Sequence, residues 1–262
     1  MIEVENLTKR FGEAVAVAGV SFRVARGELL VLVGASGSGK TTTLKMLNRL
    51  IEPDAGTVRI EGVDAASLAG PILRRRIGYV FQKVGLFPHM TVAANIAAPL
   101  QLLEKGPETS PAAIRRRVAE VLELMALPAA YAHRYPAELS GGEQQRVGVA
   151  RALAAKPRVM LLDEPFGALD PLTRDRLQES FMEVRRQLGL TAVFVTHDMV
   201  EALLLADRIA VLQGGALVQV GTPSELLRAP ADTYVEQLLA TPRRQARALE
   251  AALAAPSPRP AS

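Results

Sequence analysis

A glycine-rich loop that directly follows an apolar run is the feature that most constrains how this chain can fold. Residues 34–41 read Gly-Ala-Ser-Gly-Ser-Gly-Lys-Thr and come after the five apolar residues 29–33. A continuous apolar run of this length is typical of a strand buried on both faces of a parallel sheet, and residues 42–50 have helical spacing. The sequence therefore predicts a phosphate-binding loop between a buried strand and a helix. We call residues 34–41 the phosphate loop.

The residue types of the phosphate loop indicate a bound polyphosphate with a magnesium ion. Glycines allow backbone N–H groups to turn toward phosphate oxygens, and the positive end of the following helix strengthens the attraction. The Lys40 ammonium is expected to reach the β- and γ-phosphates, and the Thr41 hydroxyl to bind Mg²⁺. The residues expected to bind nucleotide in this region are Gly34, Ala35, Ser36, Gly37, Ser38, Gly39, Lys40, Thr41 and Thr42.

Two acidic residues follow a second apolar run. Residues 159–162 are apolar and precede Asp163 and Glu164. A parallel strand presents its carboxyl end at the sheet edge where ligands bind, so we expect Asp163 to hold Mg²⁺ through water and Glu164 to orient or deprotonate the attacking water. An apolar run before two acids is also a common structural pattern, but the phosphate loop upstream favours the functional interpretation.

A second helix start carries small residues. Ser140, Gly141 and Gly142 precede a helical run that continues to residue 153. Exposed N–H groups at such a helix start can bind an anion, whereas Ser140 alone would suffice as a simple N-cap. Because one nucleotide needs only one phosphate loop, a second anion site suggests that the nucleotide is held between two copies of the chain.

Composition excludes several classes of site. The 262 residues are 49% hydrophobic and 22% charged, which is globular and allows one large domain or two small ones. The chain lacks cysteine and has three histidines, so disulfides and Cys-ligated metals are excluded and a His-rich metal site is not expected.

The net charge of the chain is +4, and the arginine runs 74–76 and 115–117 are interpreted as solvated helix faces or as binding patches. Aromatic residues make up 4%, too few to suggest a single-strand nucleic-acid platform, and we expect no nucleic-acid partner.

Strand and helix patterns alternate along the chain, which predicts an α/β fold with a mainly parallel sheet. Strand signals fade between about residues 88 and 155, where segments rich in Ala, Leu, Glu and Arg predict an inserted helical region, clearest at 114–127. The Ala-, Pro- and Arg-rich residues 241–262 are expected to form a frayed tail. The N-terminus lacks the apolar core of a secretory signal, and no segment is apolar for the length of a spanning helix, so we expect a cytoplasmic protein.

These motifs, taken in order, resemble those of the ATP-binding cassette (ABC) ATPases over nearly the whole chain. Six motifs correspond: residues 34–42 (Walker A), Gln82 (Q-loop), residues 139–143 (signature), residues 159–164 (Walker B), residues 168–170 with Asp170 (D-loop), and His197 (switch histidine). Phe11 matches the position whose aromatic ring stacks on adenine, although Phe11 taken alone would fit an ordinary core residue.

The resemblance implies a P-loop NTPase core, an N-terminal antiparallel β subdomain and an inserted helical subdomain, in a single domain over residues 1–240. It implies that two copies close head to tail on two ATP molecules, with Ser140 and Gly142 of one copy at the γ-phosphate held by the other. Asp170 would line the seam, His197 would contact the γ-phosphate, and Gln82 would sense Mg²⁺. Residues 82–92 would dock the membrane permease, with Leu86, Phe87 and Met90 either in an exposed groove or covering the helical core.

Within this family, four segments are similar to importer ATPases for quaternary amines such as glycine betaine, choline and carnitine. These segments are residues 48–53, 77–82, 85–90 and 165–174. The resemblance implies an ATPase that drives osmoprotectant uptake from the cytoplasmic face of the inner or plasma membrane, with a solute-binding protein as an indirect partner. Many members continue into paired regulatory domains; this chain ends before them, which puts ionic-strength sensing through such domains in doubt.

Two alternatives share the same nucleotide chemistry. One is a soluble ABC protein of DNA repair or translation, although such proteins usually carry coiled-coil insertions or tandem cassettes. The other is the ATPase of an exporter or a lipid-extracting system, which would differ in its docking surface. Co-purification with a permease and a solute-binding protein, rather than with ribosomes or DNA, would support the importer.

Overall fold

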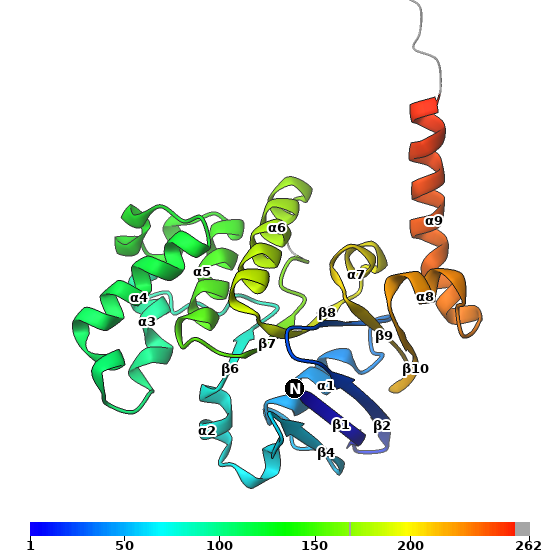
Figure 1. Ribbon diagram of the computed structural model, residues 1–262, viewed down its shortest axis with the longest axis horizontal. Coiled ribbons are helices and arrows are strands. Elements are labelled where there is room, and N and C mark those ends of the chain that lie inside the picture. The colour runs from blue at the N-terminus through cyan, green and yellow to red at the C-terminus, as the bar shows by residue number, and fades with distance from the viewer. Residues whose placement is uncertain (168, 255–262) are drawn as a thin grey trace, which may run out of the picture.

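An antiparallel sheet opens the chain in the computed structural model, which describes residues 1–167 and 169–254 (Figure 1). The strand order of this sheet is β2-β1-β4-β5. Its strands are β1 (Ile2–Phe11), β2 (Ala14–Val24), β4 (Ala55–Ile60) and β5 (Val63–Asp64). Ile2 and Val4 alternate along β1 and are buried, and Leu7 is also buried because the pairing of β1 with β2 shifts register between Val4 and Leu7.

The second sheet is parallel except at one edge, where β10 pairs antiparallel with β9. Its order is β10-β9-β3-β8-β7-β6. Its strands are β3 (Leu29–Val33), β6 (Ile77–Val80), β7 (Val159–Asp163), β8 (Thr191–Thr196), β9 (Arg208–Gln213) and β10 (Ala216–Gly221). The predicted α/β class, with a mainly parallel sheet and an N-terminal antiparallel sheet, is thereby confirmed.

β3 lies between β8 and β9, and all five of its residues are buried. Leu29, Val31 and Val33 pack in one hydrophobic cluster, which also contains apolar residues of the helices. Leu30 and Leu32 pack in the other cluster, together with the antiparallel sheet and the first helix. Because successive strand residues face opposite sides of a sheet, this division explains why the segment is continuously apolar.

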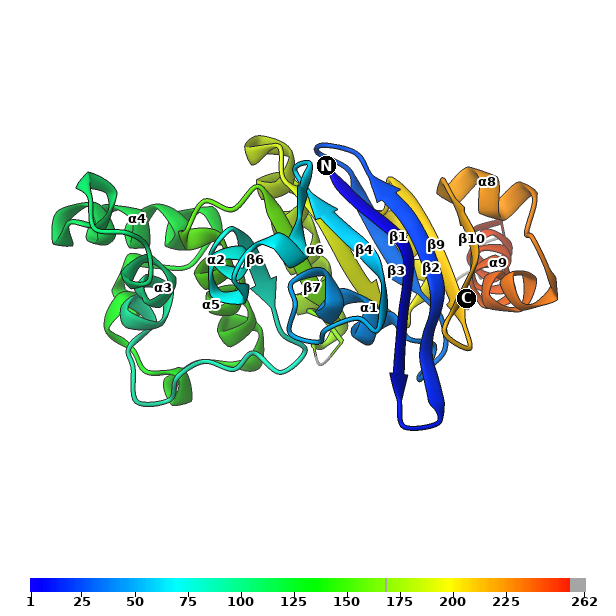
Figure 2. The same ribbon diagram turned by 90° about the horizontal axis from the view of Figure 1, so that it is seen from below.

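Helices flank the parallel sheet, and the stretch between β6 and β7 is helical (Figures 1 and 2). The α-helices are α1 (Lys40–Leu47), α2 (Gly70–Arg75), α3 (Val92–Gln101), α4 (Pro111–Leu124), α5 (Gly141–Ala154), α6 (Pro171–Leu188), α7 (Met199–Leu205), α8 (Pro223–Arg228) and α9 (Thr233–Ala254). Short 3₁₀ helices span Ala65–Ser67, Pro107–Thr109, Ala129–His133 and Pro136–Glu138.

Helix boundaries differ from the sequence prediction where caps decide them. The helix expected over residues 114–127 begins earlier, at Pro111, because the Ser110 hydroxyl accepts a hydrogen bond from the Ala113 N–H and proline suits the first helical position. It ends at Leu124, and Ala126 adopts a left-handed conformation with φ 51°. The period of apolar residues identified this helix but not its ends.

The run 115–117 contains an arginine that neither sequence interpretation described. Arg117 is buried, and its guanidinium donates hydrogen bonds to the carbonyls of Leu153 and Ala154 at 2.7 and 3.0 Å. The last carbonyls of a helix have no partner within that helix, so Arg117 of α4 closes the end of α5. Both the solvated-face and the binding-patch interpretations are wrong for this residue.

The end of the described chain also differs from expectation. The predicted frayed tail begins at residue 241, but α9 continues without a break to Ala254, and residues 255–262 lie outside the described part. Ala, Arg, Gln and Glu are strong helix formers, so the composition interpreted as a tail also supports a helix. Among the described residues, no helix combines the length and apolar character needed to cross a membrane.

Candidate functional site

The carboxyl ends of the parallel strands bring the predicted site residues together. The phosphate loop follows β3, and Asp163 is the last residue of β7 with Glu164 directly after it. Gln82 follows β6, and His197 follows β8. Because neighbouring parallel strands end at the same edge of a sheet, segments more than a hundred residues apart in the sequence share one site.

The backbone of the phosphate loop approaches its neighbours too closely for a side chain at two positions. Gly34 has φ 155°, and a Cβ there would lie 2.1 Å from the Leu212 carbonyl oxygen. Gly39 has φ 95°, and its Cβ would lie 2.4 Å from the Ala16 carbonyl oxygen. Glycine is therefore required at both positions for space as well as for backbone conformation.

Lys40 folds back over the loop that precedes it. Its ammonium donates hydrogen bonds to the carbonyls of Gly34 and Ala35 at 2.7 and 2.9 Å, and lies 3.4 Å from the Ser38 hydroxyl. Burial lowers the pKa of Lys40, while the nearby carboxylates of Glu164 and Asp163 oppose that shift. The charge is thus held within the loop by backbone carbonyls, at the place where phosphate oxygens are expected.

Thr41 and Asp163 are joined directly. The Thr41 hydroxyl donates to Asp163 Oδ1 at 2.8 Å, and Asp163 is buried. Burial raises the pKa of Asp163, and the hydrogen bond from Thr41 counteracts this. A hydroxyl and a carboxylate side by side offer the oxygen ligands that Mg²⁺ prefers.

Glu164 accepts a hydrogen bond from Gln82 and contacts His197 through the same oxygen. Its Oε2 lies 3.0 Å from the Gln82 amide nitrogen and 3.2 Å from His197 Nδ1. The Glu164 backbone has φ 43°, a left-handed conformation that costs a non-glycine residue about 1–3 kcal/mol, and its N–H donates to the Val195 carbonyl at 3.0 Å. The His197 side chain is 61% exposed. Gln82, Glu164 and His197 therefore form one group that meets at a single carboxylate oxygen.

Ser140, Gly141 and Gly142 do not lie in this group. They form the start of α5, and Figures 1 and 2 both show β6 and β7 between α5 and α1. The Ser140 hydroxyl accepts from the Glu143 N–H at 3.3 Å, and the Glu143 carboxylate accepts from the Ser140 N–H at 2.7 Å. The simple capping role that the sequence left open is thus present, and Ser140 and Gly141 are exposed as well.

Asp170 is linked to the start of α5 through one residue, Thr173. Its carboxylate accepts from the Thr173 N–H at 3.1 Å at the start of α6, and hydrogen bonds from Thr173 lower the pKa of Asp170. The Thr173 methyl group occupies the space that a Cβ of Gly142 would need, at 2.3 Å. Residue 168, the first of the expected D-loop, lies outside the described residues.

Phe11 ends β1, and its side chain is 52% exposed, so the alternative of an ordinary core residue is wrong. The Lys9 ammonium lies 5.6 Å from the centre of the ring. An exposed ring beside a cation leaves a π-face available for stacking.

Sequence patterns did not indicate one contact of the phosphate loop. The Ala35 N–H donates to the hydroxyl of Tyr234 at 2.9 Å, across 199 residues of sequence. Tyr234 belongs to no motif, and no spacing pattern connects α9 with the loop. Only the fold brings the two residues together.

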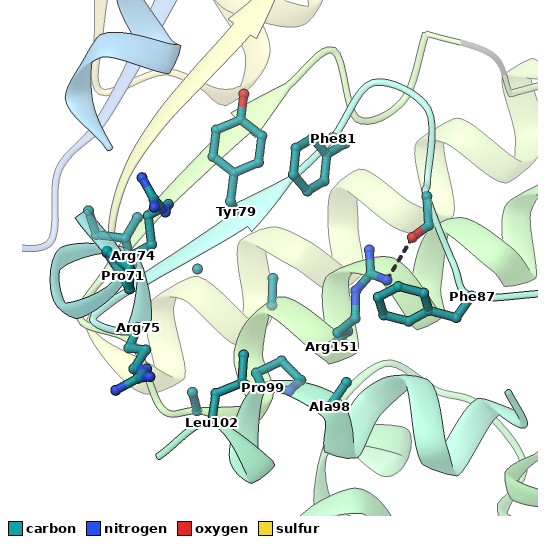
Figure 3. A pocket seen from close by; sticks show the side chains of 15 residues that line it. Pro71, Arg74, Arg75, Tyr79, Phe81, Phe87, Ala98, Pro99, Leu102 and Arg151 are labelled. Atoms are coloured by element: carbon teal, nitrogen blue, oxygen red, sulfur yellow. Dashed lines mark hydrogen bonds between the residues drawn. The ribbon is translucent and has the colours of Figure 1, made fainter. Parts of the chain in front are cut away.

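The segment after Gln82 borders a cleft of about 520 Å³. Figure 3 shows Phe81, Phe87, Pro99 and Leu102 on its wall, with Arg74 and Arg75 at one end and Arg151 donating a hydrogen bond to the Gly85 carbonyl. Phe87 is exposed, whereas Leu86 and Met90 are only partly so. The side chain of Asn95 holds this segment, accepting from the Phe87 N–H at 2.8 Å and donating to the Phe87 and Met90 carbonyls at 3.1 Å.

Comparison with known proteins identifies relatives that match most of the chain. The ABC transporter family matches residues 17–167. The choline transport ATP-binding protein OpuBA of Bacillus subtilis is 52% identical over 244 residues, and the glycine betaine uptake ATP-binding protein YehX of Escherichia coli is 49% identical over 237 residues. The matches cover 93% and 90% of this chain, but 63% and 76% of those proteins. The dimeric post-hydrolysis structure of the cassette MJ0796 with ADP and phosphate superposes with a TM-score of 0.77 at 34% identity, covering 85% of this chain and 99% of that one.

Two glycines of the loop should respond differently to alanine. Gly39→Ala places Cβ against the Ala16 carbonyl, whereas Gly37 also has a positive φ but has no atom within 4 Å of its Cβ position. We expect Gly39→Ala to lower the free energy of unfolding by about 3 kcal/mol or more, and Gly37→Ala by about 1 kcal/mol. Urea unfolding of both variants measures this difference, and equal losses would contradict the crowding at Gly39.

Proposed function

Because the chain belongs to the ABC transporter family, we propose that it is the ATP-hydrolysing subunit of an importer for a quaternary-amine osmoprotectant such as glycine betaine. It acts through separate permease subunits and attaches peripherally to the cytoplasmic face of the membrane. The observation that carries the ATPase proposal is the meeting of the phosphate loop, Asp163, Glu164 and His197 at one sheet edge. The names of the relatives support the substrate class. Residues 1–240 constitute the cassette domain.

ATP binds along the phosphate loop. The backbone N–H groups of residues 34–42 receive the phosphates at the start of α1, and the exposed Phe11 ring stacks on the adenine. The Lys40 ammonium has three N–H donors, so it keeps its hydrogen bond to the Gly34 carbonyl and exchanges the one to the Ala35 carbonyl for phosphate oxygens. The buried position of Lys40 favours this exchange, because a buried cation gains more from an anion than from neutral carbonyls.

The residues that hold Mg²⁺ in this proposal are Thr41, Gln82 and Asp163. Their donor atoms are hydroxyl, amide and carboxylate oxygens, which suit a hard cation. The contact between Thr41 and Asp163 at 2.8 Å brings two of these donors together beside the loop. When bound, the ion neutralises charge on the phosphate oxygens.

Glu164 acts as the general base. A water molecule attacks the γ-phosphorus, its proton passes to the Glu164 carboxylate, and the bond from phosphorus to the bridging oxygen breaks to give ADP and phosphate. The hydrogen bond from Gln82 and the close contact of His197, both at Oε2, orient the carboxylate. The exposed His197 ring can turn toward the γ-phosphate when nucleotide is present.

A second copy of the chain completes the site. Ser140 and Gly141 are exposed at the start of α5 and lie apart from the phosphate loop of their own copy. A head-to-tail pair allows this helix start to reach the γ-phosphate bound by the partner copy. Asp170 lies at the seam and is linked to the same helix start through Thr173. The similar cassette MJ0796 is dimeric, which supports this arrangement.

The cleft beside residues 82–92 receives the permease. Its wall carries exposed apolar groups, Phe87 and Leu102 among them, and exposed apolar surface of this kind marks protein interaction sites. Arg74 and Arg75 at one end favour a permease segment that carries acidic residues. Phe81 lines the cleft and Gln82 follows it directly, so the docking surface and the hydrolytic site are neighbours in the chain.

Glu164→Gln keeps the size of the side chain and removes the base. We expect turnover to fall by about 100-fold or more, with ATP still bound and an ATP-bound dimer accumulating. Lys40→Ala should instead weaken ATP binding by about tenfold or more, because a charge-assisted contact is lost. Phosphate release, nucleotide titration and gel filtration measure these effects. The control is Glu183→Gln on the exposed face of α6, and near-normal hydrolysis by Glu164→Gln would reject the proposed base.

Charge introduced into the cleft should prevent docking. Leu102 lines the cleft and is 60% exposed, whereas Leu204 is 73% exposed on α7, away from the cleft. We expect Leu102→Asp to lose the permease during co-purification and Leu204→Asp to retain it, since burying a charge against an apolar partner is costly. Both variants should bind ATP. Retention of the permease by Leu102→Asp would show that docking occurs elsewhere.

The transported solute can be tested in the complete complex. With the permease and solute-binding protein reconstituted, we expect glycine betaine, choline or carnitine to stimulate ATP hydrolysis and sulfate to have no effect. Stimulation by sulfate, or by none of the quaternary amines, would overturn the substrate class but leave the ATPase proposal intact.

A further inference from the structure

The hydroxyl of Tyr234 connects α9 to the phosphate loop. It accepts a hydrogen bond from the Ala35 N–H at 2.9 Å and lies 3.4 Å from the Leu212 carbonyl, to which it donates. The same Leu212 carbonyl packs against Gly34, where a Cβ would approach it to 2.1 Å. The peptide between Gly34 and Ala35 is therefore enclosed by β9 on one side and by Tyr234 on the other.

That peptide also carries an acceptor for the ammonium of Lys40. The Gly34 carbonyl accepts from Lys40 Nζ at 2.7 Å, and the N–H of the same peptide unit, which belongs to Ala35, donates to Tyr234. A peptide unit is planar and trans, so its C=O and N–H point in opposite directions. Fixing the N–H toward Tyr234 consequently fixes the direction in which the carbonyl meets Lys40.

The turn that carries Tyr234 is itself held in place. Asp232 accepts a hydrogen bond from the Val235 N–H at 2.9 Å through its carboxylate, which caps the start of α9. Gln219 of β10 donates to the Ala229 carbonyl and accepts from the Ala231 N–H, both at 2.9 Å. The Val235 side chain is fully buried. The position of the hydroxyl is thus determined by the fold around it rather than by the loop.

We infer that Tyr234 is a positioning residue for Lys40: its hydroxyl aligns the Gly34–Ala35 peptide, and through it the ammonium that receives the phosphates. This inference rests on the proposed function, because the affinity that it affects is that for ATP. The contact of Tyr234 also links the first turn of α9 to the nucleotide site. A shift of α9 therefore changes nucleotide affinity, and by the reciprocity of linked binding, bound nucleotide changes the stability of that turn.

Tyr234→Phe removes the hydroxyl and keeps the ring. We expect the dissociation constant for ATP to rise by about three- to tenfold, the effect of one hydrogen bond, and the Ala35 amide to exchange its hydrogen faster. The matched control is Tyr135→Phe, which removes a hydroxyl from a ring that is 47% exposed and should change neither quantity. In wild-type protein, ATP should slow exchange of the amides of Val235 and its neighbours in α9.

A double-mutant cycle separates positioning from a general structural role. If Tyr234 acts through Lys40, Tyr234→Phe should cost little further ATP affinity in a Lys40→Ala background, because coupled residues are not additive. An equal loss in both backgrounds would overturn the inference, as would unchanged ATP affinity in Tyr234→Phe alone. If the wild-type protein did not bind ATP, the proposed function would be refuted instead. In that case the hydrogen exchange of the Ala35 amide still tests the inference, because an unchanged exchange rate in Tyr234→Phe would show that the hydroxyl does not align the Gly34–Ala35 peptide.

Discussion

The burial of β3 on both faces is the constraint on which the rest of the structure depends. Its side chains alternate between two hydrophobic clusters, so the strand cannot shift along its axis without disturbing both. The phosphate loop begins where this strand ends, and Gly34 packs against the Leu212 carbonyl of the adjacent strand β9. The loop is therefore a turn held by packing on several sides, and its backbone N–H groups are oriented before any ligand arrives.

The polar groups of the site are satisfied by one another. Lys40 donates to carbonyls of the loop, Thr41 donates to Asp163, and Glu164 accepts from Gln82 and lies beside His197. Buried polar groups without partners are costly, so these contacts stabilise the folded chain in the absence of nucleotide. They also hold each group close to the position from which it would act, which is how a fold prepares an electrostatic environment before reaction.

The helical region carries the helix start at Ser140 that is proposed to act on the nucleotide of a partner copy. This helix start lies apart from the phosphate loop of its own copy. Arg117 closes the far end of α5, and Thr173 packs against Gly142 at its near end. The start of α5 is therefore tied to the start of α6, where Asp170 forms the cap. Movement of one copy against another would carry Ser140 and Asp170 together, because both lie on packed helix ends and not on independent loops.

Local patterns in the sequence determined a large part of this protein. The five apolar residues of β3, the phosphate loop after them and the helix that follows the loop could all be predicted, because strand burial, glycine content and helical period depend on neighbouring residues. The acids after β7 were predicted to meet the loop because parallel strands end at a common edge. What such patterns specify is the type of each element and the chemistry at its end.

Only the tertiary structure decided which distant groups meet. Nothing in the residues around Arg117 distinguishes a helix-closing arginine from a solvated one, and the left-handed backbone of Glu164 follows no local rule for that residue type. The contact between Ala35 and Tyr234 joins segments 199 residues apart. Periodicity and motif spacing describe residues that are close in sequence, whereas these contacts depend on how whole elements pack, and packing is settled by all of the side chains together.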